Sequence, residues 1–189
     1  MTLLEPTTVP SQLAGTWKID PVHSEVSLSV RHLMVSKVRG RFGDFAGTIV
    51  IAEDPLESHV EAVVALASID TGNEGRDAHV RSADFFDVEQ FPELTFRSTG
   101  VRPDGDDFIV DGELSLHGVT RQVPLHVEVT GFQAATPFGD TRVGFSATAE
   151  IDRYDFDITF NSPLEGGGVG LGRKIQIALE IQAVRESLG

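Results

Sequence analysis

Three side chains that could carry out nucleophilic catalysis lie close together near the N-terminus, namely Asp20, His23 and Ser24. A hydroxyl nucleophile, an imidazole base and a carboxylate that orients the base are the groups of a hydrolase triad. The Gly-x-Ser-x-Gly turn that exposes the serine in many hydrolases does not occur in the sequence. Short polar side chains beside a proline more often cap a turn. We therefore predict a capped turn at residues 20–24 and assign no catalytic residue.

The spacing of the ligand-type residues gives little support for metal or cofactor chemistry. The chain has no cysteine, which excludes disulfides and zinc–cysteine sites. The histidines form no His-x-His or His-x-x-x-His pair; they are His23, His32, His59, His79, His117 and His126. The glycine-rich run at 166–172 precedes Arg173-Lys174 and an apolar strand, so it lacks the helix of a phosphate-binding loop. We predict no metal site and no cofactor, and a mobile loop over 166–172.

A basic run is the most distinctive charged feature. Arg31, Lys37, Arg39 and Arg41 lie within eleven residues that contain no acid. This run is either a solvated connection between two strands or a patch that attracts an anionic head group at the mouth of a cavity. Arg76, Asp77, His79 and Arg81 form a second cluster, for which we predict helix capping and ion pairing. Arg153 follows a strand, where a structural corner is the favoured interpretation.

Length and composition indicate what kind of protein must position these groups. The chain has 189 residues, of which 40% are hydrophobic and 23% charged, as expected for one soluble globular domain. Fifteen basic and 29 acidic residues give a net charge of −14. A field of that sign repels nucleic acids and anionic surfaces, so we predict no nucleic-acid partner, and an anionic ligand would require a local basic patch.

The N-terminal residues carry no targeting pattern. They lack a positive n-region, and Glu5, Pro6 and Pro10 interrupt any apolar run, which is unlike a signal peptide. No stretch of 18 apolar residues occurs, so we predict no transmembrane segment. We expect a cytoplasmic location, with a flexible arm over residues 1–14 and one domain over residues 15–189.

Alternating hydrophobicity predicts an all-β domain. Val26, Leu28 and Val30 alternate with polar residues, and similar patches recur along the chain. Turns are expected at 103–105 and at 117–118, where Gly118 permits a positive φ. Residues 73–86 have few β-forming residues and read as one short helix capped by Asn73. Eight or nine antiparallel strands in chain order are typical of an up-and-down barrel or a sandwich.

Ordered motifs from about Gly15 to Glu186 resemble the YceI-like family of polyisoprenoid-binding proteins. The most specific is Arg76-Asp-x-His-Val-Arg-Ser-x-Asp-Phe-Phe-Asp87. Other matching motifs are Trp17-x-Ile-Asp-Pro-x-His23-Ser24, Val30-Arg-His32, Val38-x-Gly40-x-Phe42, Ser68-Ile-Asp-Thr-Gly-Asn73, Gly112-x-Leu-x-Leu-x-Gly-Val-Thr120 and Ile151-Asp-Arg153. Two positions depart from the family pattern: Asp152 stands where asparagine is frequent, and Asp157 where glycine is frequent. Many relatives in this family are periplasmic.

The resemblance implies an extended eight-stranded antiparallel lipocalin-like barrel with one short helical insert and an apolar pore. Such a protein would carry or sequester a long-chain isoprenoid, of the polyprenyl pyrophosphate or quinone type, or a similar amphiphilic lipid. By strand parity and position we expect the pore to be lined by Trp17, Val26, Leu28, Val30, Phe42, Phe45 and Ile49. The candidate head-group residues at the mouth are Arg31, His32, Lys37 and Arg39, although Arg31 does not share the inward parity of Val30.

Two other functions remain open from the sequence. An enzyme acting on a lipid-like substrate would need titratable groups in the cavity, with His23, His32, His79 and Asp77 as the candidates. Since no catalytic motif is present, we predict that the chain is not an enzyme. A barrel with a solid core could instead act through protein contacts, and exposed strand edges could pair two copies into a homodimer.

Overall fold

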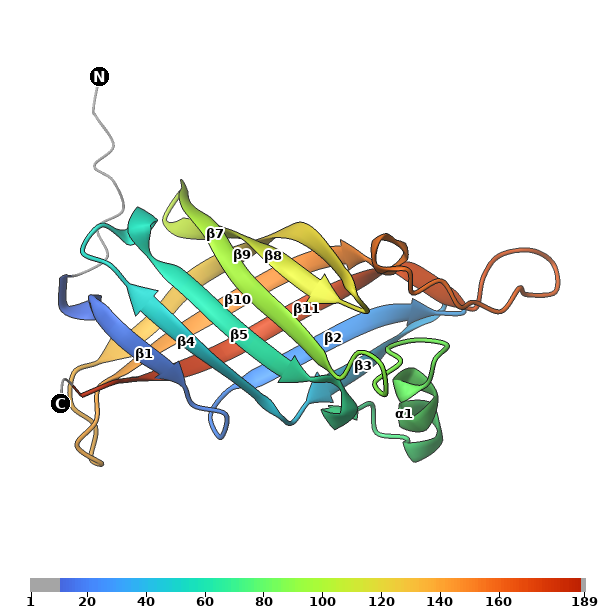
Figure 1. Ribbon diagram of the computed structural model, residues 1–189, viewed down its shortest axis with the longest axis horizontal. Coiled ribbons are helices and arrows are strands. Elements are labelled where there is room, and N and C mark those ends of the chain that lie inside the picture. The colour runs from blue at the N-terminus through green and yellow to red at the C-terminus, as the bar shows by residue number, and fades with distance from the viewer. Residues whose placement is uncertain (1–10, 188–189) are drawn as a thin grey trace, which may run out of the picture.

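The structure, a computed structural model, describes residues 11–187 and is an elongated barrel of antiparallel strands (Figure 1). Within those residues the strands are β1 (Gly15–Ile19), β2 (Glu25–His32), β3 (Ser36–Phe42), β4 (Phe45–Ile51), β5 (His59–Ala65), β6 (Ile69–Asp70), β7 (Glu93–Asp104), β8 (Asp107–Leu116), β9 (Val119–Gln133), β10 (Arg142–Asp152) and β11 (Leu171–Arg185). The helices are α1 (Glu74–Arg81) and the short 3-10 turns η1 (Ser11–Leu13), η2 (Pro55–Glu57), η3 (Leu66–Ser68) and η4 (Arg153–Phe156).

Strand β11 closes the barrel. It pairs with β10 along one edge, and its other edge pairs with β1 at residues 183–185 and with β2 at residues 171–180. The closed ring runs β1–β4–β5–β7–β8–β9–β10–β11, with β2, β3 and β6 extending the wall beside β11. The predicted eight-stranded antiparallel barrel with one helix is confirmed.

The predicted turns and helix form where the sequence places them. Gly105 turns the chain between β7 and β8 with φ 62°, and His117 and Gly118 both adopt positive φ between β8 and β9. Asn73 caps α1, because its side-chain oxygen accepts a hydrogen bond from the Arg76 backbone at 2.8 Å. The helix ends at Arg81, earlier than the predicted segment 73–86.

A cluster of buried side chains fills the barrel end where β1 begins and β11 ends. This end cluster consists of Leu13, Trp17, Ile51, Val143 and Ala183. The Trp17 indole donates a hydrogen bond to the Leu13 carbonyl at 2.9 Å, and the Arg185 guanidinium lies 4.6 Å from the indole ring centre. Within the predicted arm, residues 11–13 form η1 and bury Leu13 in this end cluster, whereas residues 1–10 lie outside the described residues.

The helical insert lies at the opposite end of the barrel. Helix α1, the turn between β2 and β3 and the loop before β11 all lie at this end (Figure 1). Val80, Phe85 and Phe86 pack against the main core from the insert. No helix among residues 11–187 is long and apolar enough to cross a membrane.

Candidate functional site

The barrel encloses an apolar cavity of about 590 Å³. Known small-molecule sites have volumes of roughly 300–1,000 Å³, so the cavity is large enough for a ligand. It reaches from the end cluster, where Leu13 and Ile51 line it, to the insert, where Val80 and Phe85 line it. Among the described residues, no aspartate or glutamate lines the cavity. The chain therefore does not have a solid core.

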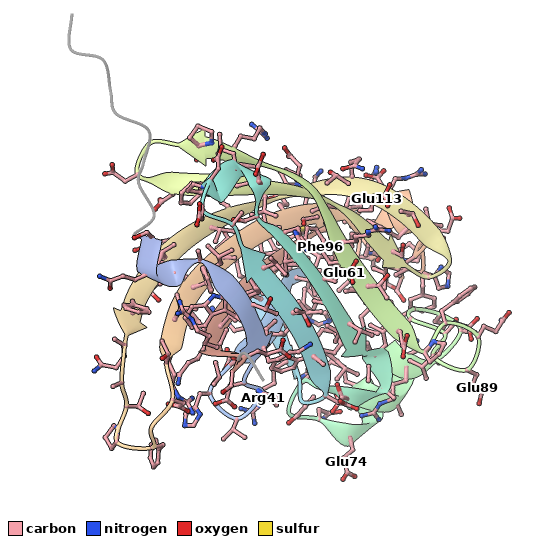
Figure 2. The ribbon with its side chains drawn as sticks, turned by 60° about the vertical axis from the view of Figure 1, so that its left-hand side comes forward. Arg41, Glu61, Glu74, Glu89, Phe96 and Glu113 are labelled. Atoms are coloured by element: carbon pink, nitrogen blue, oxygen red, sulfur yellow. The ribbon has the colours of Figure 1, made fainter. Side chains whose placement is uncertain are left out.

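Strand alternation separates this apolar interior from a charged exterior. Phe96 is buried and lines the cavity, whereas Glu61 and Glu113 are exposed on neighbouring strands (Figure 2). On β2, residues 26, 28, 30 and 32 line the cavity and residues 29 and 31 do not, while Ser27 is the one residue of the other parity that also lines it. The period of two along the strands thus places most apolar side chains inside and the acidic ones outside.

Six of the seven residues expected in the pore line the cavity. They are Val26, Leu28, Val30, Phe42, Phe45 and Ile49. Trp17 does not line it, which corrects that expectation. Its ring is completely buried in the end cluster and packs edge-on against Phe132, with ring centres 6.5 Å apart. Trp17 has the expected inward parity, but it lies in the end cluster, beyond the part of the barrel that is hollow.

Only one of the four expected head-group residues lines the cavity. His32 does so at the insert end, together with Leu33. Arg31, Lys37 and Arg39 do not line it, because their side chains occupy the outward parity of β2 and β3. Arg31 is paired with Lys37 across the hairpin, and Arg39 lies opposite Ser29. These three cations therefore do not line the cavity, and their proposed contact with a head group at the mouth stays a prediction.

Other polar side chains surround the mouth instead. Arg76, His79 and Arg153 line the cavity at this end, beside Asn161 and Ser162. Arg76 is fixed by two hydrogen bonds to Thr71, from Nε to the hydroxyl at 2.7 Å and from the guanidinium to the carbonyl at 2.6 Å. Sequence reasoning assigned Arg76 to the helix alone, since its position at the mouth depends on how the insert folds back over the barrel.

Asp77 secures the insert and does not line the cavity. Its carboxylate accepts hydrogen bonds from the backbone and hydroxyl of Thr71, and the hydroxyl bond is the main reason that the pKa of Asp77 lies below its usual value. His79 interacts with Asp84 at 2.7 Å. Its ring contacts those of Phe85 and Phe160 edge-on, with ring centres 5.0 and 5.1 Å away. These rings join the insert to the loop before β11 across one side of the mouth.

Arg153 is the corner residue predicted from the sequence. It is buried, and its guanidinium donates to the carbonyls of Ile158, Phe160, Leu171 and Gly172 at 2.8–3.3 Å. Burial lowers its pKa below the usual arginine value. Asp157, which replaces the frequent glycine, ends η4 in the left-handed region with φ 57°, a conformation that glycine adopts most readily. Asp152 caps η4 and binds Arg173 at 2.7 Å.

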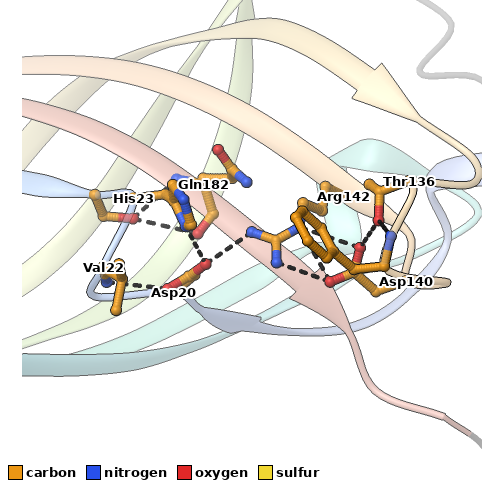
Figure 3. A network of polar contacts seen from close by, with 9 residues as sticks. Asp20, Val22, His23, Thr136, Asp140, Arg142 and Gln182 are labelled. Atoms are coloured by element: carbon orange, nitrogen blue, oxygen red, sulfur yellow. Dashed lines mark hydrogen bonds and ion pairs between the residues drawn. The ribbon is translucent and has the colours of Figure 1, made fainter.

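The triad-like residues near the N-terminus do not form a catalytic triad. Asp20 accepts hydrogen bonds from the Val22 backbone and His23 (Figure 3). The Ser24 hydroxyl instead donates to the Gln182 carbonyl at 3.2 Å and accepts from the Gln182 backbone. Of the four residues considered for an enzyme, His32 and His79 line the cavity, whereas His23 and Asp77 do not. Within residues 11–187, no three His, Asp or Glu side chains cluster as metal ligands would.

Comparison with known proteins identifies relatives over most of the chain. A family model described as a YceI-like domain matches residues 17–183. The UPF0312 protein plu2095 of Photorhabdus laumondii subsp. laumondii is 37% identical over 182 residues, which cover 93% of this chain and 90% of the relative.

Two solved structures share the architecture. Burkholderia cenocepacia BcnA matches with a TM-score of 0.76 at 22% identity, over 87% of this chain and 98% of its own. A polyisoprenoid binding domain from Saccharophagus degradans, implicated in plant cell wall breakdown, matches with a TM-score of 0.68 at 17% identity, over 90% of this chain and 98% of its own. At these identities the likeness shows the fold.

Proposed function

The chain belongs to the YceI-like family, and we propose that it carries or sequesters a long-chain isoprenoid, or a similar amphiphilic lipid, with the apolar tail inside the barrel. The matching family model is described as a YceI-like domain and not as an enzyme family, which supports the prediction that the chain is not an enzyme. The Saccharophagus degradans domain with the same fold is described as polyisoprenoid-binding, which supports the proposed class of ligand.

The continuous apolar cavity is the observation that carries this proposal. It has apolar walls from the end cluster to the insert, and the described residues contribute no carboxylate to its lining. Each methylene moved from water into such a cavity contributes about 0.8 kcal/mol before the cost of ordering the tail. A flexible hydrocarbon chain therefore fits this interior better than a polar metabolite does.

The groups at the mouth suit an anionic or polar head. Arg76 and His79 line that end, and Arg153 lies beside them. Arg76 has donors beyond the two bonds that fix it to Thr71. We propose that the lipid enters tail first and leaves its pyrophosphate or quinone head beside Arg76, His79 and His32.

Solvent extraction of the purified protein, followed by mass spectrometry, tests this function. We expect about one isoprenoid per chain, and none from a mock purification. Protein that yields no lipid is then incubated with geranylgeranyl pyrophosphate as a probe. An empty extract together with no uptake of the probe would overturn the proposal.

Leu28→Trp tests where the tail lies. Leu28 lines the cavity on β2, so an indole at this position should occupy space that the tail needs and reduce lipid loading at least tenfold. Ser29→Trp is the matched control, because residue 29 has the outward parity of the same strand and lies opposite Arg39. Circular dichroism verifies that both variants fold. Equal loading of the two variants would place the ligand elsewhere.

A further inference from the structure

The turn between β2 and β3 exposes three apolar side chains. Leu33, Met34 and Val35, the β2–β3 tip, are 43%, 60% and 83% exposed. Leu33 and Met34 both have positive φ, at 53° and 58°, and the Val35 backbone donates to the His32 carbonyl at 3.0 Å. Two such residues in succession define a turn for which Asn-Gly is preferred, because larger side chains are strained there. The tip therefore has strained apolar residues where polar, strain-free ones are usual.

Cations without acidic partners lie directly behind the tip. Arg31, Lys37 and Arg39 are exposed on the outer face of β2 and β3. None of them has an ion pair with a carboxylate of residues 11–187, and Arg41 reaches Asp70 only at 3.8 Å. By contrast, Arg173 and Lys174 on the adjacent strand β11 both pair with Asp152. The β2–β3 surface is thus locally positive in a chain of net charge −14.

The tip lies at the mouth of the cavity. His32 and Leu33 line the cavity, and the Leu33 backbone donates to the Gly170 carbonyl at 2.8 Å. Val169, in the same loop, is also exposed. In Figure 1 the end of β2 and the start of β3 lie at the insert end of the barrel, away from β1. Whatever contacts the tip also lies beside the opening.

We propose that the β2–β3 tip docks on an anionic lipid bilayer. The apolar tip enters the interface between head groups and acyl chains, while Arg31, Lys37 and Arg39 contact lipid phosphates. Apolar burial combined with cations is the usual basis of interfacial binding. At physiological salt the screening length is about 8 Å, so acids farther than this from the membrane contribute little to the field that it meets. This inference concerns the protein surface and does not depend on the ligand proposed for the cavity.

The other barrel end does not match such a surface, although it also exposes apolar side chains. Val22 and Phe138 are 83% and 86% exposed. Their neighbours in sequence include Asp20 and Asp140, and the cation between these acids, Arg142, is bound to both. Charge complementarity to anionic lipid is therefore found at the tip and not at this end.

Flotation of the purified protein with vesicles tests the proposal. The vesicles contain phosphatidylcholine alone or phosphatidylcholine with phosphatidylglycerol, and no isoprenoid. We expect binding to the anionic vesicles only. Leu33→Asn/Met34→Gly installs the preferred turn sequence, so it should keep or raise stability while weakening vesicle binding at least tenfold. Lys37→Gln/Arg39→Gln should weaken binding about fivefold for each cation removed.

Two double variants away from the tip serve as matched controls. Val22→Ser/Phe138→Ser removes exposed apolar surface at the other end, and Lys18→Gln/Arg97→Gln makes the same charge change on exposed side chains of β1 and β7. Both should bind vesicles as the unmodified chain does. The proposal is overturned if the tip variants bind anionic vesicles as well as the unmodified chain does, or if the control variants lose as much vesicle binding as the tip variants. It is also overturned if the tip variants only abolish self-association in analytical ultracentrifugation. Vesicle binding together with an empty extract and no uptake of the geranylgeranyl pyrophosphate probe would leave docking valid and reject the proposed ligand. Lipid loading without vesicle binding would reject docking alone.

Discussion

Replacing Arg142 by leucine should loosen the closed end of the barrel. Arg142 binds Asp20 at 2.7 Å and Asp140 at 2.8 Å, and so joins the turn after β1 to the turn before β10 (Figure 3). The side chains of Arg142, Asp20 and Asp140 are at most 24% exposed. Their attraction is therefore screened less by water than that of a surface ion pair.

The magnitude follows from the titration of Asp20. Burial alone would raise the pKa of Asp20, but hydrogen bonds from His23 and Arg142 outweigh burial and lower the pKa from 3.8 to about 2. This difference in the pKa of Asp20 between the folded and the unfolded chain corresponds to roughly 2.5 kcal/mol of stability at pH 7. Arg142 supplies part of this and also lowers the pKa of Asp140 by its hydrogen bond. We expect Arg142→Leu to cost about 2 kcal/mol at pH 7.

Urea unfolding at pH 7 and pH 3 measures this cost. Because the folded pKa of Asp20 lies below the unfolded value, the stabilisation is complete above about pH 4–5 and disappears as the pH falls through 2. The difference between the unmodified chain and Arg142→Leu should thus shrink to about half at pH 3. Arg102→Leu is the control, since the Arg102–Asp111 pair is 2.6 Å long but more exposed, and should cost less than about 1 kcal/mol. A cost no greater than that of the control, or equal costs at both pH values, would refute the reasoning.

Two further substitutions test the corner and the end cluster. Arg153→Met removes the guanidinium that donates to four carbonyls around the loop before β11, so we expect the free energy of unfolding to fall by about 3 kcal/mol. Amide hydrogen exchange should become faster in residues 158–172 but not in β8. Unchanged exchange in residues 158–172 would contradict the role of Arg153. Trp17→Ala should cost about 3–5 kcal/mol in thermal unfolding, because the indole is completely buried and bonded to Leu13. The exposed neighbour Lys18→Ala should cost little, and equal losses would show that Trp17 does not seal the barrel end.

Strand parity predicts the wall of the cavity because a pleated strand leaves only two sides for each residue. Val26, Leu28 and Val30 alternate with polar residues, and all three line the cavity. Parity contains no information on depth along the barrel axis. Trp17 faces inward as expected, yet the depth of β1 in the barrel places it in the end cluster. Only the register between β1, β4 and β11 determines this.

The mouth was harder to predict, since it brings together segments far apart in the chain. The basic run suggested a head-group site because its residues are close in sequence, but alternation sends Arg31, Lys37 and Arg39 outside. Arg76 and Arg153 reach the cavity from the insert and from η4. Their sequence motifs predicted a capped helix around Arg76 and a structural corner at Arg153, and both features are present in the structure. No sequence pattern indicated that both would also face one opening.

The two ends of the barrel are held together differently, and this difference favours ligand entry at one end. At one end, the buried Trp17 and the Asp20–Arg142–Asp140 ion pairs close the barrel with covered, mutually bonded groups. At the other end, side chains of His79, Phe85 and Phe160 meet only edge-on, and the strained turn at Leu33 leaves apolar surface exposed. Opening the first end would separate partly buried charges, which is costly, whereas at the second end the insert meets the loop before β11 through aromatic contacts, which cost less to separate. A lipid tail should therefore enter and leave beside the β2–β3 tip, which is the surface that we propose contacts the bilayer.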